Sequence, residues 1–344
     1  MAHRIDMTTG RPALAYCARH GTPWHGLGVA SPGLMTPIQA IVAACLDWRA
    51  IEHPLGTPIY SVDGLTGWRE VPSHKVLVRS DTSGILGVVG EGYKVVQNQE
   101  VAEILSGGFG TDTPSIDVAG AIDDGRRIWF LARLPDTFEV RPGDPIEQNL
   151  LLTAAHDGSG AIQAINTPIR VVCANTLTLA FREADRATRS IYSIRHTGDA
   201  TIRAHALANT IAASTGYWTR LRAAFGSLAA QAVTRHEVGA VLRKLFPDNV
   251  TEDGEVKPTA QVLRARVRVV ELFDGAAQGA AIAGSTRWGL LQAVTQYIDQ
   301  EQPTRGVPEA EQAGTRRLRS LLGDPTAQGL RQAAFDLLLQ SSLT

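Results

Sequence analysis

The spacing of hydrophobic and polar positions changes twice along the first hundred residues. Residues 37–48, PIQAIVAACLDW, have the spacing of a short amphipathic helix. Its expected buried stripe consists of Ile38, Ile41, Val42 and Cys45. From about residue 50 to 95, β-branched runs alternate with Gly and Asp turn signals, which predicts strands. GYKVVQNQEVAEIL then predicts a strand that enters a helix, with Asn98 as the N-cap.

Two hairpins are expected next, because apolar runs flank polar turns at Asp123-Asp124-Gly125 and at His156-Asp157-Gly158. A further strand precedes Asn175, where a helix is expected to start. After residue 199 the chain is rich in Ala and Leu and predicts helices to its end. The expected fold class is α+β: an antiparallel or mixed sheet with packed helices, followed by a mainly α-helical C-terminal region. The expected divisions are an irregular N-terminal arm over 1–36, a core over 37–198 and a helical region over 199–344.

An a/d seam runs through the first long helical segment. Its members are Leu207, Ile211, Ser214, Trp218, Leu221, Phe225 and Leu228. Such a seam is typical of a core helix packed on its own domain, or of a helix at a subunit interface. Both interpretations stay open at this point.

Composition narrows the class of protein. With 344 residues, 44% of them hydrophobic and 19% charged, the chain is expected to be a soluble globular protein. No apolar run is long enough for a membrane span, and the N-terminal residues lack the apolar core of a signal peptide. The 3 cysteines are scattered, which favours reduced thiols and a cytoplasmic location.

Charge is distributed unevenly. Residues 1–159 hold 12 Lys and Arg against 18 Asp and Glu, whereas residues 160–270 hold 15 against 8. The basic segment is dominated by arginine, which suits planar contacts with phosphate. The candidate nucleic-acid contacts are Arg126, Arg127, Arg170, Arg182, Arg186, Arg189, Arg195 and His196.

Two interpretations of these cations remain open. Neighbouring aromatic residues could stack on bases, as single-strand binding proteins require. The candidates are Trp129, Phe130, Phe181 and Tyr192. Alternatively, Glu183 and Asp185 neutralise the arginines and the aromatic residues belong to the core.

The sequence gives little support for a nucleotide-binding, metal-binding or catalytic site. The glycines at 107, 108 and 110 are not followed by Gly-Lys-Ser/Thr, and no G-x-G-x-x-G occurs, so no nucleotide cofactor is expected. Cys17, His20 and His25 lack a fourth ligand, so no metal is expected. His156, Asp157 and Ser159 are neighbours on a turn and would point apart, so we expect a structural turn rather than a catalytic triad.

Several segments together resemble the phage/plasmid-like protein family, a group with a domain of unknown function. They are WHGLG, GYKVVQNQE, RIWFLARLP, LLLTAAHDGSGAIQA, IRVVCANTL, IRHT and TRWGLLQAVTQYIDQ. The last differs from the expected pattern by Gln292 in place of Asn. More distantly, the order of sheet, helix and helical extension is similar to that of single-strand annealing recombination proteins, which form oligomers and need no nucleotide cofactor. This second likeness is an analogy between folds.

The leading hypothesis is therefore a cytoplasmic, homo-oligomeric, non-enzymatic protein that binds single-stranded DNA and anneals it. The alternative is a protein-interaction or host-modulating factor without DNA binding. A metal-dependent nuclease around His156 and Asp157 ranks last, because no second carboxylate or histidine follows at a suitable spacing.

Overall fold

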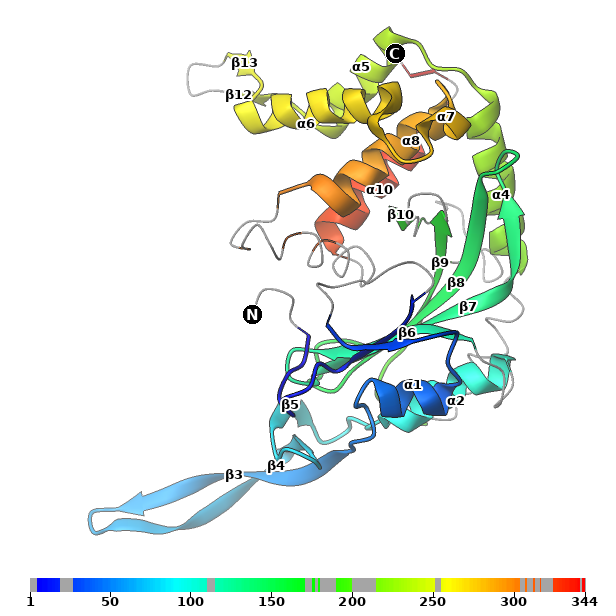
Figure 1. Ribbon diagram of the computed structural model, residues 1–344. Coiled ribbons are helices and arrows are strands. Elements are labelled where there is room, and N and C mark those ends of the chain that lie inside the picture. The colour runs from blue at the N-terminus through cyan, green and yellow to red at the C-terminus, as the bar shows by residue number, and fades with distance from the viewer. Residues whose placement is uncertain are drawn as a thin grey trace.

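A computed structural model shows an α+β protein, with the sheet in the N-terminal half and helices in the C-terminal half (Figure 1). The fold class predicted from the sequence is confirmed. The structure describes residues 5–18, 27–109, 115–170, 175–176, 179, 190–199, 215–250, 255–303, 307, 312, 316, 324–340 and 342–343.

The strands make one large mixed sheet and two small sheets. Their bounds are β1 Leu14–Cys17, β2 Val29–Ser31, β3 Ala50–Ser61, β4 Gly64–Arg79, β5 Ile85–Gly90, β6 Ile116–Ile122, β7 Arg127–Glu139, β8 Pro145–Ala155, β9 Ile162–Arg170, β10 Asn175–Thr176, β11 Ile191–Ile194, β12 Asn249–Val250 and β13 Val256–Lys257. The large sheet has the order β10-β9-β8-β7-β6-β1-β2, and β11 also pairs with β9. All of its pairings are antiparallel except β1 with β2.

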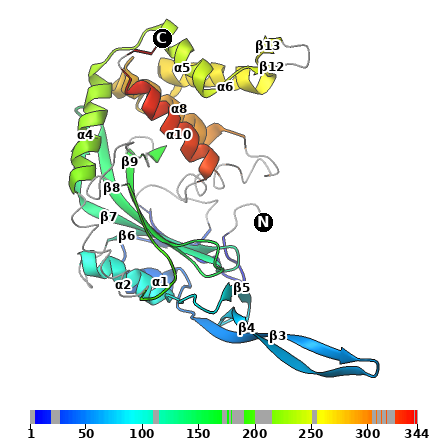
Figure 2. The ribbon, with the colours of Figure 1, turned by 180° about the vertical axis from the view of Figure 1, so that it is seen from behind.

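The helices flank one face of the sheet and build the opposite lobe (Figures 1 and 2). Their bounds are α1 Pro37–Ala43, α2 Asn98–Phe109, α4 Thr215–Ala230, α5 Arg235–Leu245, α6 Ala260–Glu271, α7 Ala280–Ala283, α8 Arg287–Gln296 and α10 Pro325–Leu338, with π-helical turns η3 Leu272–Ala276 and η4 Tyr297–Glu301. None of the helices in these described ranges has the length and apolar character to cross a membrane.

Both predicted hairpins are present, because their turns suit the backbone that a tight reversal needs. At the β6–β7 turn Asp123 and Asp124 have φ of 55° and 60°, and Gly125 follows at 87°. Asp tolerates this left-handed region better than most residues, and glycine has no Cβ to oppose it. At the β8–β9 turn Gly158 has φ of 76°, and the backbone N–H of Ser159 donates to Asp157 Oδ1 at 2.9 Å.

The large sheet carries apolar residues on both faces. One face packs on α1, α2 and the β3–β4–β5 sheet, and its core includes Phe130, Leu152 and Ala164. The other face holds a smaller cluster with Leu14, Trp129 and Leu151. Both faces of β8 are covered, since all of its residues after Pro145 are buried, and its second half from Leu150 to Ala155 is apolar except for Thr153.

The helical lobe is joined to the sheet at the β7–β8 turn. Phe138 and Ile146 share a core with helices α4 to α10. Trp288 Nε1 on α8 donates to Asp144 Oδ2 at 2.8 Å, and Arg141 Nη2 donates to Ala229 O at 2.5 Å. The β7–β8 hairpin therefore belongs to both halves of the molecule.

Three local predictions in the first hundred residues are wrong. The segment expected to be an irregular arm contains β1 and β2 of the large sheet. The predicted buried stripe of α1 is confirmed only at Ile41: Ile38 and Val42 are exposed, and Cys45 is half-buried beyond the end of the helix. Residues 91–97, where a strand is expected, form only an isolated bridge between Tyr93 and Thr197 before α2.

Asn175 does not start a helix as expected, and residues 177–178 and 180–189 lie outside the described residues. Asn175 and Thr176 form β10 and pair with Arg170 and Ile169. The physical reason is the open edge of β9, since β11 pairs only with its first half and leaves the second half able to bond another strand.

The a/d seam belongs to a core helix where the structure describes it. Trp218, Leu221, Phe225 and Leu228 of α4 are buried in the core of the helical lobe. Leu207, Ile211 and Ser214 lie outside the described residues. The interpretation of residues 218–228 as a core helix is confirmed.

Candidate nucleic-acid interface

Three chain connections meet at one end of the large sheet. β7 begins and β8 ends here, since Arg127 pairs with Ala155. β9 begins and β11 ends here, since Ile162 pairs with Ile194. We call residues 123–126, 156–161 and 195–199, together with Arg127, the turn end of the sheet.

Four of the eight predicted contact residues lie at the turn end: Arg126, Arg127, Arg195 and His196. Arg126 and Arg195 are exposed, Arg127 is half-buried and His196 is buried. Lys94, which the sequence reasoning missed, joins them: it is exposed, and its backbone N–H donates to His196 O at 2.7 Å. Three segments that are far apart in sequence thus place exposed cations at one end of the sheet.

Arg170 lies at the other end of β9, opposite Ile146. Arg170 is eight positions along β9 from Ile162, which corresponds to about 26 Å at the usual rise per residue of a strand. Its side chain lies outside the described part of the structure, as do Arg182, Arg186 and Arg189 altogether. Among the described residues, Arg170 therefore lies apart from Arg126, Arg127 and Arg195.

His196 is held inside the molecule rather than presented to solvent. Its ring is stacked on Tyr93 with centroids 4.5 Å apart and an interplanar angle of 11°. Its Nδ1–H donates to Lys94 O at 3.0 Å, and Tyr93 Oη donates to Ala155 O at 2.7 Å. Burial lowers the pKa of His196, so the ring is neutral at pH 7. We therefore assign it a role in fixing Lys94 and Arg195, not in binding phosphate.

His156 lies beneath the same turns and has no exposed surface. Its ring nitrogen Nε2 is 2.8 Å from Asn98 Oδ1, and its ring makes an edge contact with Trp48 at 5.4 Å. The Asn98 amide group donates to the carbonyls of Leu46 and Trp48, at 3.0 and 3.2 Å. Asn98 Oδ1 must therefore accept a hydrogen bond from His156, so the proton of the neutral imidazole lies on Nε2.

Asn98 is therefore not the helix N-cap that local sequence rules predict. Its side chain ties the loop before β3 to the β8–β9 turn. Burial, followed by the nearby His196, lowers the pKa of His156 to about 3. A buried neutral histidine of this kind supports the turn and does not reach a substrate.

Arg79, the last residue of β4, contacts the turn end from the β3–β4–β5 sheet. It is 1% exposed, and its Nη1 donates to Asp6 Oδ2 at 2.5 Å and to the carbonyl of Asp124 at 3.2 Å. Nη2 donates to Asp81 Oδ2 at 2.7 Å, and the guanidinium lies 4.4 Å from the centre of the Trp48 ring. One buried cation thus connects the N-terminal segment, β4 and the β6–β7 turn.

The aromatic residues expected to stack on bases do not do so. Trp129 and Phe130 have no exposed surface and Tyr192 is 7% exposed. They alternate on strands that have both faces covered, and a local pattern cannot distinguish such residues from exposed ones. Phe181 lies outside the described residues.

Carboxylates occur among the cations of the turn end. Asp123, Asp124 and Asp157 belong to the same turns and Asp199 lies in the third segment; Asp124 and Asp199 are exposed. Within the described residues, no group of three His, Cys, Asp or Glu side chains is arranged to hold a metal ion. The described residues of the turn end thus carry charges of both signs.

A family model described as "Domain of unknown function (DUF932)" matches residues 85–322. The chain belongs to the DUF932 family. No curated protein matches the chain, and no solved structure matches it.

The DUF932 match contains the turn end but begins after the whole β3–β4 hairpin, at the first residue of β5. Three of the segments that carried the resemblance meet inside it. GYKVVQNQE supplies Tyr93 and Asn98, HDGSG supplies His156, and IRHT supplies His196. The signal for this network was thus present in the sequence, although nothing in the spacing showed that the three segments touch.

Proposed function

We propose that this DUF932 protein binds single-stranded DNA and promotes annealing of complementary strands. The observation that carries the proposal is the convergence of Lys94, Arg126 and Arg195, all exposed, at the turn end. Their side chains stand on turns braced by the buried network of His156, His196 and Arg79. Cations on rigid turns suit contacts with phosphates, because the backbone that carries them has little conformational freedom to lose on binding.

In this proposal the chemistry is entirely electrostatic. Lys94, Arg126 and Arg195 neutralise phosphates of one strand and leave its bases free to pair with a second strand. The turn end also carries the carboxylates of Asp123, Asp124, Asp157 and Asp199, which equal in number its cations Lys94, Arg126, Arg127 and Arg195. We therefore expect binding that is weak at physiological salt and strong at low salt.

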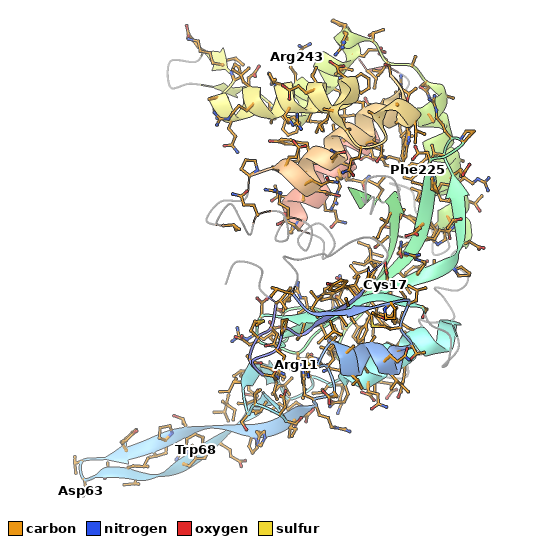
Figure 3. The ribbon with its side chains drawn as sticks, viewed as in Figure 1. Arg11, Cys17, Asp63, Trp68, Phe225 and Arg243 are labelled. Carbon is orange, nitrogen blue, oxygen red and sulfur yellow. The ribbon has the colours of Figure 1, made fainter. Side chains whose placement is uncertain are left out.

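The salt dependence of binding tests the proposal. The double variant Arg126→Ala/Arg195→Ala should reduce the slope of log K against log salt by about 0.7 for each lost phosphate contact. Fluorescence anisotropy with a labelled single-stranded oligonucleotide, titrated at several salt concentrations, measures this slope. Arg243→Ala is the matched control, because Arg243 is exposed on α5 in the helical lobe (Figure 3).

An unchanged slope in the double variant would remove the turn end from the interface. Equal loss in Arg243→Ala would mean that the whole surface attracts DNA without a defined site. Absence of single-strand binding by the unmodified protein at low salt would contradict the proposed function itself.

A second candidate is a protein-interaction factor that binds no DNA, and one observation favours it. The β3–β4 hairpin extends far from the body and exposes Tyr60 and Trp68, at 70% and 63% (Figure 3). Exposed aromatic residues are enriched where proteins contact each other. A pull-down of a stoichiometric partner by a protein that fails to bind DNA would favour this candidate.

A further inference from the structure

The β3–β4–β5 sheet has an apolar face turned away from the core. Ile51 pairs with Val78 and Val78 with Ile85, while Val76 pairs with Val88, and directly opposite residues share a face. Ile51, Ile85 and Val88 are 43%, 63% and 50% exposed. We call Ile51, Val76, Val78, Ile85 and Val88 the base patch.

The distal part of the same hairpin carries a second exposed apolar surface. Tyr60 pairs with Leu65 across the hairpin, and Trp68 lies opposite Pro58. Tyr60, Val62, Leu65 and Trp68 are 70%, 102%, 66% and 63% exposed, and we call them the arm tip. Both ribbon views show the hairpin leaving the body, so the body of the same molecule does not cover the arm tip (Figures 1 and 2).

We propose that a second copy of this chain covers the base patch and the arm tip, in a dimer formed through the β3–β4–β5 sheets. The residues of the base patch are all β-branched and none is charged. Two copies can therefore approach through this face without repulsion between like charges. Apolar faces of twisted sheets pack on each other in this way in β-sandwiches.

The exposed area agrees with a dimer of ordinary size. Three exposed side chains of the base patch and four of the arm tip together present on the order of 800 Å² of accessible surface per copy. One partner contributes about this area to a stable interface. A two-fold arrangement buries the same surface on both copies, as most soluble dimers do. Neither patch alone would supply this area.

The charges of the hairpin argue against nucleic acid as the occupant. Lys75 is paired with Glu52 at 2.9 Å, and Arg79 is buried with Asp6. The outer part of the hairpin carries Arg69 with Asp63 and Glu70, so it has no positive excess to attract phosphates. The dimer is independent of the proposed DNA binding, which uses the turn end.

Sedimentation equilibrium over about 1–50 µM protein tests the inference. The unmodified chain should sediment as a dimer of the 36.8 kDa protomer. Ile85→Thr/Val88→Thr keeps β-branched residues in the strand but makes the base patch polar, and should weaken dimerisation at least tenfold. Leu65→Ser/Trp68→Ser should weaken it similarly from the arm tip.

The matched control is Val267→Thr, since Val267 is 56% exposed on α6 in the other lobe. This variant should leave the dimer unchanged. Circular dichroism checks that each variant keeps its fold, as expected for substitutions of exposed residues. A monomer at 50 µM, or a dimer that neither double variant weakens, would overturn the inference. Loss of the dimer with DNA binding intact would support it while leaving the proposed function standing.

Discussion

Arg79→Met should lower the free energy of unfolding by about 3–5 kcal/mol, because it leaves a buried carboxylate without its partner. Asp6 is 2% exposed and bonds Arg79 Nη1 at 2.5 Å. The variant also loses the bond to the carbonyl of Asp124 and the stacking of the guanidinium on Trp48. Urea unfolding followed by circular dichroism at pH 7 measures the difference.

Two further variants distinguish the stability lost by breaking the buried ion pair from the stability lost by removing any arginine. Arg79→Met/Asp6→Leu removes both charges and should recover part of the lost stability. Arg235→Met breaks a pair with Asp274 in which the arginine side chain is 67% exposed, and should cost less than about 1 kcal/mol. Equal losses in Arg79→Met and Arg235→Met would contradict the role given to Arg79.

The free energy of unfolding should also fall steadily as the pH is lowered from about 6.5 toward 4. Burial, with the neighbouring His196, lowers the pKa of His156 to about 3. In the unfolded chain His156 takes up a proton near pH 6.5, whereas the folded state excludes that proton until about pH 3. Between these values the unfolded state binds more protons, so stability is lost by up to about 1.4 kcal/mol per pH unit.

Urea titrations at pH 7.0, 6.0, 5.0 and 4.5 give this slope. His156→Gln should be less stable at pH 7 but should show a shallower dependence on pH, because the group that titrates has gone. His53→Gln, at an exposed position on β3, should keep the original slope. The lowered pKa of His196 acts in the same direction, so His196→Gln should also flatten the curve. A slope in His156→Gln equal to that of the unmodified protein would refute the assignment.

The hairpins could be predicted because their information is local. Asp123, Asp124 and Gly125 specify a turn whatever surrounds them, and the flanking apolar runs specify strands. The spacing of Trp218, Leu221, Phe225 and Leu228 predicted a buried helix face, but their burial in the helical lobe was needed to favour a core helix over a subunit interface.

What local patterns could not supply were contacts between distant segments. Asn98 fits the rule for an N-cap, yet its oxygen meets His156, a residue 58 positions further along the chain. Arg79 lies within the segment predicted to form strands, and nothing in that local pattern showed that it is a buried junction. The pattern over residues 50–95 predicted strands, but not that Tyr60 and Trp68 are exposed on a projecting hairpin.

The central claim is that the protein brings complementary single strands together without a nucleotide cofactor. The most direct measurement is the rate at which two complementary labelled oligonucleotides pair, followed by fluorescence quenching at low salt and without ATP. The account predicts that the protein accelerates pairing, and that Arg126→Ala/Arg195→Ala loses most of the acceleration while Arg243→Ala keeps it. An unaltered pairing rate in the presence of folded protein would contradict the account.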